Sequence, residues 1–177
     1  MAVDLQPHLF GKLIELRPLR EDDWSALSQV ASDPLIWEQH PNHDRHKKNV
    51  FRKFFDEGTD SGGALVAIDR QTQRIIGSSR MVWYDRETLT IEIGWTFLAR
   101  SCWGGAYNGE MKRLMLDHVF TFAHRVVFVI GSDNRRSRRA IERIGAVLTT
   151  CREVGTDPQG RPIDLVVYEI LNSQPRG

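Results

Sequence analysis

Hydrophobic residues along the chain are spaced in two ways. Some segments are continuous apolar runs, which are typical of strands, and others repeat every three or four positions, which is typical of helices. Apolar runs at residues 64–69, 74–84 and 87–97 follow one another, separated by short polar turns. Runs of this length bounded by turn residues predict consecutive strands. From Met111 to Phe122 the apolar residues instead recur every three or four positions, which predicts a long amphipathic helix with one buried face.

The remaining segments continue this alternation. Helices are predicted from residue 21 to about 33, around 50–58 with its end at Gly58, and around 140–144; strands are predicted at 13–16, 126–130, 147–154 and 165–170. This order favours an α/β (α+β) fold of three layers, with a mixed central sheet of about seven strands and helices on both faces. We expect residues 1–177 to form a single domain.

Composition narrows the class of protein. A chain of 177 residues with 41% hydrophobic and 27% charged residues is typical of a globular protein. A net charge of +1 gives no basic excess, so we expect no nucleic-acid partner. No apolar run reaches the ~20 residues of a membrane span, and the first residues lack a secretory signal. Cys102 and Cys151 form no disulfide framework, which favours a cytoplasmic protein.

The stretch that carries most chemical information joins a strand to a helix through a glycine-rich turn. Glu92-Ile93-Gly94-Trp95 is followed by Ser101-Cys102-Trp103-Gly104-Gly105-Ala106-Tyr107-Asn108-Gly109-Glu110. Small residues before a helix leave several backbone N–H groups free at its positive end. The turn is therefore a candidate site for an anion such as a pyrophosphate.

Glu92 is the acidic residue of the strand that leads to this turn. Its apolar neighbours Ile91 and Ile93 occupy the alternate positions, so Glu92 faces the opposite side of the sheet. An acid on the polar face of a strand is often only a surface residue. Because ligands of open α/β sheets bind at the carboxyl ends of strands, Glu92 is also a candidate working group.

A dinucleotide-binding reading of the turn is weaker. Ala106 stands where the second glycine of that fingerprint belongs, although Asp133 follows at the next strand end. The unit lies mid-chain, with too little sequence after it to complete a doubly wound sheet. His40, His43 and His46 recur every third residue, but no acid or cysteine completes a convincing set of ligands, so no metal is expected.

Two motifs together resemble those of the GCN5-related N-acetyltransferase (GNAT) family. The turn at residues 101–106 is similar to the family pattern Q/R-x-x-G-x-G/A, with Ser101 in place of the usual Gln or Arg. Asn134-Arg135-Arg136-Ser137, followed by Gly145-Ala146, resembles the second pattern, N-x-x-S-x7-G-A/F. The similarity extends over about residues 13–171 and is closest to the RimJ/RimL branch of ribosomal-protein alanine acetyltransferases.

The resemblance implies acetyl-CoA as cosubstrate and a set of site residues. It implies that Glu92 is the general base, acting through water, and that Ser137 protonates the leaving thiolate. Asn134 would bind the pantetheine arm or the start of the helix; both Asn134 and Ser137 could equally be helix caps. The implied acetyl-CoA-binding residues are Trp95, Thr96, Phe97, Trp103, Gly104, Gly105, Ala106, Tyr107, Asn108, Asn134 and Ser137.

The implied reaction is direct transfer of the acetyl group to a primary amine in a ternary complex. The acceptor would enter between residues 37–55, 83–84 and 156–161, and it could be a protein N-terminus, a polyamine or another small amine. A homodimer is left open. Two alternatives stand beside this reading: a non-catalytic acyl-CoA-binding regulatory module and, less favoured, a dinucleotide-dependent oxidoreductase.

Overall fold

The computed structural model describes residues 3–157 and 159–172. Within these residues the chain forms eight strands and four α-helices. The helices are α1 (Trp24–Ala31), α2 (Lys48–Asp60), α3 (Ala106–Val119) and α4 (Arg135–Glu142). The strands are β1 (Leu9–Phe10), β2 (Ile14–Pro18), β3 (Ala64–Asp69), β4 (Ile75–Asp85), β5 (Thr90–Leu98), β6 (Arg125–Gly131), β7 (Val147–Thr156) and β8 (Pro162–Leu171).

All strands of the described residues join one mixed sheet in the order β1-β2-β3-β4-β5-β6-β8-β7. Neighbouring strands run antiparallel except β5 and β6, which run parallel. The mixed sheet confirms the predicted fold class. The strand count exceeds the expected number because the two-residue strand β1 pairs with β2; a segment so short has no periodicity to read.

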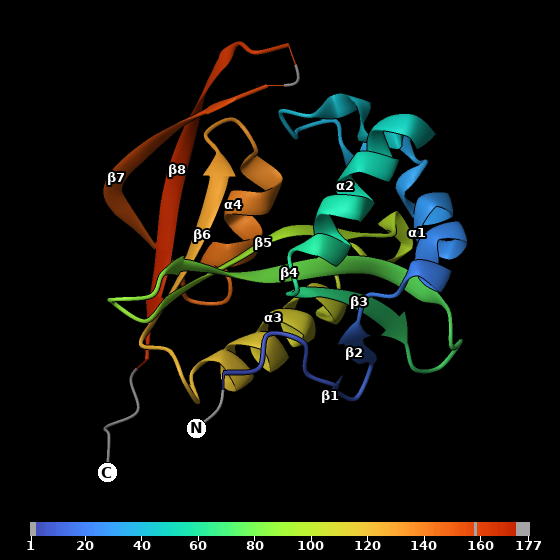
Figure 1. The fold of residues 1–177 in the computed structure, drawn as a ribbon, viewed down its shortest axis with the longest axis horizontal. Coiled ribbons are helices and arrows are strands. Elements are labelled where there is room, and N and C mark those ends of the chain that lie inside the picture. Colours follow the sequence, from blue (N-terminus) through green and yellow to red (C-terminus); the bar gives the residue numbers. More distant parts are fainter. Residues whose placement is uncertain (1–2, 158, 173–177) are drawn as a thin grey trace.

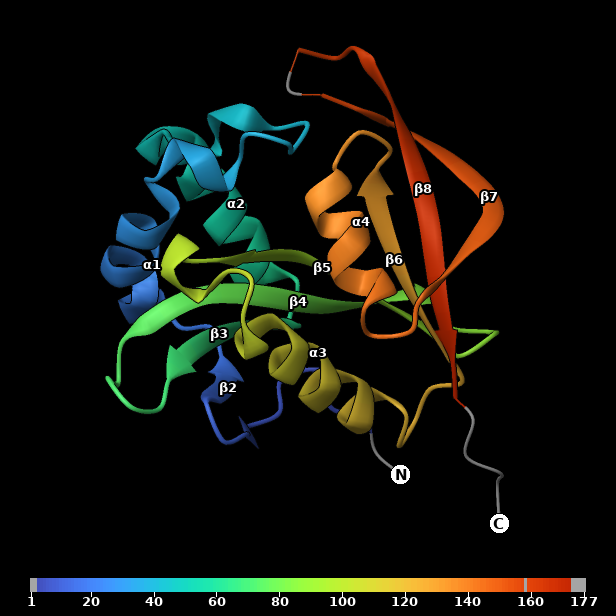
Figure 2. The same ribbon diagram turned by 180° about the vertical axis from the view of Figure 1, so that it is seen from behind.

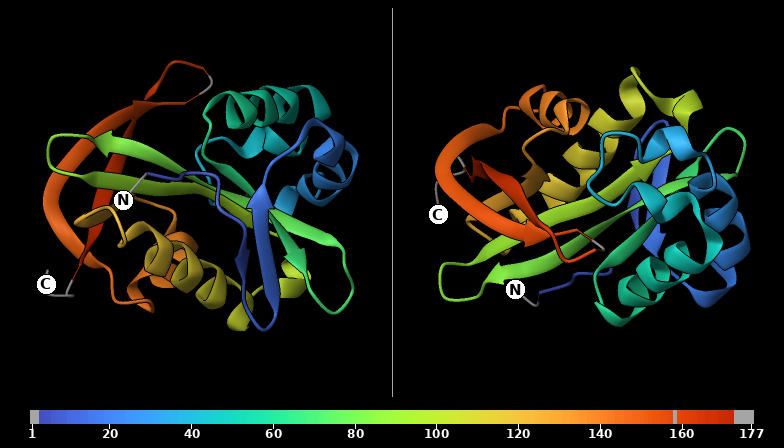
Figure 3. Two further views of the ribbon diagram at one scale, coloured as in Figure 1. Left: turned by 60° about the horizontal axis from the view of Figure 1, so that its bottom comes forward. Right: turned by 90° about the horizontal axis from the view of Figure 1, so that it is seen from above.

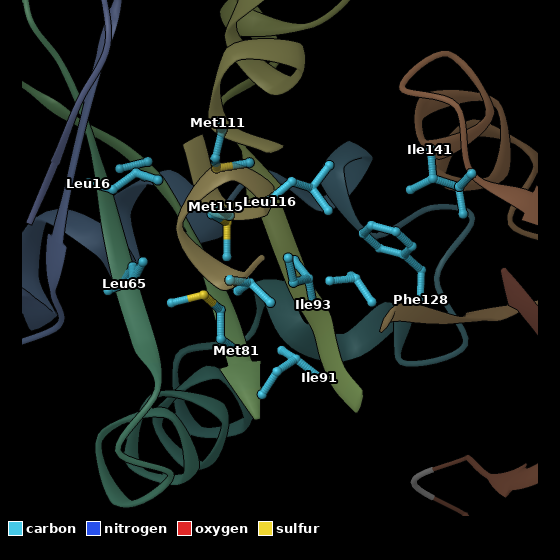
Figure 4. Packing of buried hydrophobic residues seen from close by; sticks show 14 of the residues in the cluster. Leu16, Leu65, Met81, Ile91, Ile93, Met111, Met115, Leu116, Phe128 and Ile141 are labelled. Carbon is cyan, nitrogen blue, oxygen red and sulfur yellow. The ribbon is translucent and has the colours of Figure 1, made fainter. Parts of the chain in front are cut away.

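Helices cover both faces of the sheet, as the sequence predicts (Figures 1 and 2). On one face, α1 and α2 enclose an aromatic core that includes Phe51, Phe54 and Phe97. On the other face, α3 and α4 cover a second core. Figure 4 shows Met111 and Met115 of α3 facing the buried side chains of the central strands in this second core.

The parallel pair β5–β6 is short, and this sets the shape of the molecule. The two strands pair only from Thr90 to Glu92 of β5 and from Arg125 to Val127 of β6. Beyond Glu92 they part, although β5 continues to Leu98. Strands β6, β8 and β7 therefore turn away from the rest of the sheet, as the view from above shows (Figure 3). The edge of β5 that faces β6 lacks a strand partner after this point.

A β-bulge lies on β5 where the strands part. Arg80 of β4 is opposite Gly94 and Ser78 is opposite Phe97, so one β4 residue faces two residues of β5. Trp95 lies in this bulge with φ of 52°. A positive φ is uncommon for a bulky residue and costs conformational energy, which the surrounding contacts must hold in place.

One predicted helix end is wrong. Gly58 lies inside α2, which continues to Asp60. A side chain at Gly58 would meet the Arg80 guanidinium at 3.2 Å and Leu19 at 3.3 Å. The glycine is thus explained by close packing of α2 on the sheet rather than by a helix end. No helix of the described residues is both long and apolar enough to span a membrane.

Candidate active site

The glycine-rich turn is an open loop at the start of α3. Gly104, Gly105 and Ala106 are exposed, and α3 begins at Ala106 with no side chain capping it. Gly104 has φ of 70°, a value that favours glycine. A Cβ atom added to Gly104 or Gly105 would meet nothing within 4 Å. The free N–H groups of the first helical turn therefore face open space, and this fits a phosphate group.

Trp103 has a different place from its glycine neighbours. Its backbone N–H donates to the Arg100 carbonyl at 3.0 Å, so this N–H does not belong to the set of free donors. The indole Nε1 donates to the Leu98 carbonyl at 3.0 Å, and the Arg136 guanidinium lies 4.1 Å from the ring centroid. Trp103 thus fixes the loop against the end of β5 and against α4.

Tyr107 and Asn108 lie in the first turn of α3, where their N–H groups are available to a ligand. The Tyr107 hydroxyl donates to Asp69 of β3 at 2.6 Å. The turn before it is anchored in this way to the central sheet. Glu110, one turn on, accepts hydrogen bonds from the backbone N–H groups of Lys12, Leu13 and Ile14. The start of α3 is consequently fixed from two sides.

The residues of β5 proposed to line the acetyl-CoA arm differ in what their side chains do. The Phe97 ring is buried in the aromatic core and lies 5.1 Å from Trp37, centroid to centroid. The Trp95 ring lies against the Arg80 guanidinium at 4.8 Å. The Thr96 hydroxyl points to the α3 face, where it contacts Ser79 and Lys112. The backbone of this stretch has no strand partner on the side of β6, so its polar groups there are available to a ligand.

Glu92 is the last β5 residue paired with β6, and its side chain lies on the α1–α2 face of the sheet. Burial raises the pKa of the Glu92 carboxyl to about 7; the negative charge of Glu153 adds to this rise and Arg80 opposes it. A Cβ atom at Gly94 would lie 3.2 Å from Glu92 Oε1. The glycine therefore leaves room beside the carboxylate. A carboxyl that titrates near neutral pH can accept a proton at that pH.

Two groups from separate parts of the sheet, Tyr84 and Glu153, are close enough to Glu92 to interact with it electrostatically. The Tyr84 hydroxyl of β4 donates a hydrogen bond to Glu153 of β7. This bond and partial burial raise the pKa of Tyr84 to about 12, so the phenol stays protonated. Tyr84 belongs to the predicted acceptor rim, whereas Glu153 does not. The predicted acceptor rim also includes residues 156–161 at the tip of the β7–β8 hairpin. Of these, Pro158 lies outside the described residues.

Asn134 and Ser137 lie at the start of α4. Asn134 is the N-cap residue, and its side-chain oxygen accepts from the Ser137 N–H at 3.1 Å. The capping role considered for Asn134 is thus present in the structure. Ser137 lies in the first turn of α4, and α4 follows β6, the strand that parts from β5. The two motifs meet through Arg136, whose guanidinium lies 4.1 Å from the centroid of the Trp103 ring.

Of the three histidines in the predicted acceptor rim, His40 has a structural place. His40 Nδ1 accepts from the Asn42 N–H at 2.9 Å and His40 Nε2 lies 3.1 Å from Arg45. Burial, together with nearby positive charges, lowers the pKa of His40 to about 3, so this ring is neutral. Within the described part of the chain, no group of three or more ligand-type side chains could hold a metal ion.

Three site residues were not found from the sequence. Glu153 lies in β7, where buried and exposed positions do not alternate regularly. Arg80 is 6% exposed, and its buried Nε has no hydrogen-bond partner. Lys112 is 3% exposed. Arg80 and Lys112 sit at positions where the apolar repeat predicts core. A charged residue at a predicted core position was the available signal for both.

The fold and the site together define a class of protein. An open junction between parallel strands, beside an exposed glycine-rich helix start, suits an extended ligand that carries phosphate groups. A model of the acetyltransferase (GNAT) domain matches residues 14–147, which is more than half of the chain. The chain therefore belongs to this family. Its members use acetyl-CoA, and the protein is an N-acetyltransferase.

Solved structures of the same family share the fold. An acetyltransferase of this family from Brucella melitensis has a TM-score of 0.84 and 20% identity over 95% of this chain and 80% of its own. One from Bacillus anthracis has a TM-score of 0.78 and 20% identity over 95% and 100%. Spermidine N-acetyltransferase from Vibrio cholerae, in complex with CoA and spermine, has a TM-score of 0.70 and 17% identity over 92% and 98%. Among curated proteins, none matches this sequence.

Proposed function

We propose that this protein transfers the acetyl group of acetyl-CoA to a primary amine, with Glu92 as the general base. The observation that carries this proposal is the position of Glu92. Its carboxyl is half-buried, has a pKa raised to about 7 mainly by that burial, and lies where β5 and β6 part. A base at this position can take a proton from an amine that reaches the opening from the α1–α2 face.

The residues around the opening fit acetyl-CoA as the donor. The free N–H groups of residues 104–108 would hold its pyrophosphate at the start of α3. The unpaired edge of β5 at residues 95–97 would meet the pantetheine arm, and a backbone N–H there would bind the thioester carbonyl. When bound, acetyl-CoA supplies the activated acetyl group: a C–N bond forms, the C–S bond breaks, and the net reaction releases one proton.

The protein's part in this reaction is to move protons. Glu92 accepts the proton that an ammonium group must lose before its nitrogen can attack. Ser137, across the opening at the start of α4, donates a proton to the leaving thiolate and recovers one from the nitrogen through solvent. The Ser137 N–H donates a hydrogen bond to the Asn134 side chain, and this bond fixes the backbone that carries the Ser137 hydroxyl.

The acceptor proposed here is an amine that is positively charged in solution. Glu92 and Glu153 both face its side of the opening, and Tyr84 holds Glu153 in place. Paired carboxylates attract a cation. This favours a polyamine or a protein N-terminus over a neutral acceptor. The tryptophan before the glycine in the loop, Trp103-Gly104, supports a protein N-terminus, because it is part of the resemblance to the RimJ/RimL branch. Spermidine, spermine and an alanine-initiated peptide are therefore the first acceptors to assay.

Replacement of Glu92 tests the base assignment. In Glu92→Gln, kcat/KM near neutral pH should fall by about 100-fold, since a general base contributes about 10²–10⁴-fold. The deficit should shrink at high pH, where the free amine is already abundant. CoA release is measured against pH with the best acceptor from the panel. Glu87→Gln is the matched control, because Glu87 is exposed at the β4–β5 turn. An unchanged profile in Glu92→Gln would rule out this role.

A non-catalytic acyl-CoA-binding module is the second candidate. The observation that favours it is Ser101, which stands where the family pattern has Gln or Arg. Calorimetry with acetyl-CoA, run beside the CoA-release assay over the amine panel, separates the two. Binding without release of CoA on any amine would favour the module.

A further inference from the structure

Lys112 of α3 is a buried ammonium group with no acidic partner. Its side chain is 3% exposed. Its Nζ donates to the Ser79 hydroxyl at 3.1 Å and to the Thr96 hydroxyl. These two hydroxyls lie 2.8 Å apart, and each lies 3.3 Å from the Gly94 carbonyl oxygen. Among the described residues, no carboxylate pairs with Nζ.

Packing does not explain a lysine at this position. Its helix neighbours Met111 and Met115 are fully buried hydrophobic residues. A methionine at position 112 would fill similar space without the cost of burying a charge, which is large when no opposite charge compensates it. A buried charge that lowers the stability of the fold in this way is typical of a functional site.

The location of the ammonium group gives it a role. Thr96 is the second residue of the β5 bulge, after Trp95, and Ser79 is the β4 residue opposite that bulge. On the other side, Nζ lies 5.9 Å from the centroid of the Phe128 ring. Phe128 is the first β6 residue beyond the last β5–β6 pair. Figure 4 shows Phe128 beside Ile93, the β5 residue at the same level. The Lys112 ammonium group therefore lies on the α3 face of the sheet, next to the point where β5 and β6 part.

We propose that Lys112 is a positioning residue for acetyl transfer. Through Thr96 and Ser79 its ammonium group holds the β5 bulge, and it places a positive charge beneath the strand edge that would receive the thioester carbonyl. This inference rests on the proposed function. Negative charge that develops on the carbonyl oxygen is stabilised by a fixed positive charge in a site of low dielectric constant.

The protonation state of Lys112 then controls the rate. Burial alone lowers the pKa of Lys112 to about 7. The groups that face it are Ser79 on β4, Thr96 on β5 and Phe128 on β6, and none of these changes charge in this range. Because the protonated form is the active one, kcat should fall as pH rises above neutrality. Glu92 acts in the opposite sense, so the wild-type profile should be a narrow bell.

Two neutral variants test the role of the charge. Lys112→Met removes both the charge and the hydrogen bonds, whereas Lys112→Gln keeps a donor. We expect kcat at neutral pH to fall at least about tenfold in both, less than the 10²–10³-fold cost of losing a direct donor. The alkaline fall of kcat should disappear, and KM for acetyl-CoA should change little. Lys53→Met, at an exposed position of α2, is the control.

Unfolding supplies a readout that does not depend on activity. If Lys112 were a structural anchor, both variants would be less stable than the wild type. The inference predicts the reverse for Lys112→Met near neutral pH, because an uncompensated buried charge is removed. Urea unfolding of the unliganded proteins measures this. Loss of stability in Lys112→Met together with full kcat in Lys112→Gln would overturn the inference.

Failure of the inference can be told apart from failure of the proposed function. Wild-type protein that binds acetyl-CoA but acetylates no amine would contradict the proposed function. An active wild type whose Lys112→Gln variant keeps its kcat and its alkaline fall would overturn the role of Lys112 alone.

Discussion

At the scale of single residues, the site depends on charges placed where the fold disfavours charge. Glu92 is a half-buried carboxyl in the central strand β5, and partial burial is the main reason that its pKa is raised to about 7. The alternation of the strand predicts that it faces away from Ile91 and Ile93, and the structure has it so. Its pKa depends on burial and on Glu153, which is about sixty positions away and reaches the site only because β7 follows β8 across the sheet.

The contribution of Glu153 can be measured directly. In Glu153→Gln, the negative charge beside Glu92 is lost while the side chain can still accept the Tyr84 hydrogen bond. The pKa of Glu92 should fall, so the acid limb of kcat/KM should move to lower pH; burial, the larger cause, should keep part of the rise. Tyr84→Phe retains the charge of Glu153 and should not move the limb downward. A limb that stays in place in Glu153→Gln would show that the two carboxyls do not interact.

At the scale of elements, the sequence predicts what periodicity and caps encode. The long helix, the three central strands and the glycine-rich turn follow from local patterns, and the structure has them. The start of α4 is less visible, because its first turn is a run of arginines around Ser137. The bulge at Trp95 and the parting of β5 and β6 are also hidden. Both depend on pairing between strands, which a single sequence does not display.

The cap of α4 carries a prediction at this scale. Asn134→Ala removes the acceptor for the Ser137 N–H and should cost about 1 kcal/mol of stability. It should also lower kcat, since Ser137 lies in the turn that the cap holds. Asn134→Asp keeps the acceptor and adds a negative charge at the helix N-terminus, so it should recover both. Urea unfolding and CoA release measure the pair, and an Asp variant as unstable as the Ala variant would refute the cap.

At the scale of the whole molecule, the site lies between two parts of one sheet. Strands β1–β5 form one part and β6–β8 the other, joined by the short parallel ladder. Side chains also link them: Arg136 of α4 donates to the Ile36 carbonyl at 2.6 Å and stacks on Trp103. The glycine-rich turn, Glu92 and Ser137 thus come from both parts, and their spacing is set by how the sheet opens.

Glu92 and Lys112, on opposite faces of this opening, should shape the stability of the whole protein against pH. The pKa of Glu92 rises from 4.5 to about 7 on folding. Between these values the folded state holds a proton that the unfolded chain has released, so this group makes stability fall as pH rises. The pKa of Lys112 falls from 10.5 to about 7. Above neutrality the unfolded chain holds the extra proton, so this group makes stability rise with pH.

The two effects meet near neutral pH, where both groups oppose folding. Urea unfolding at about pH 5, 7 and 9 should separate them. Glu92→Gln should gain stability over the wild type at pH 7 and 9 but little at pH 5, where the wild-type carboxyl is protonated in the folded state. Lys112→Met should gain most at pH 5 and 7, and the gain should shrink at pH 9 as the folded wild type loses the charge. Gains that do not vary with pH would mean that neither group titrates near neutrality in the folded protein. The proposed acetyl transfer at neutral pH needs an ionised Glu92 and a protonated Lys112 at the same time, and that result would contradict it.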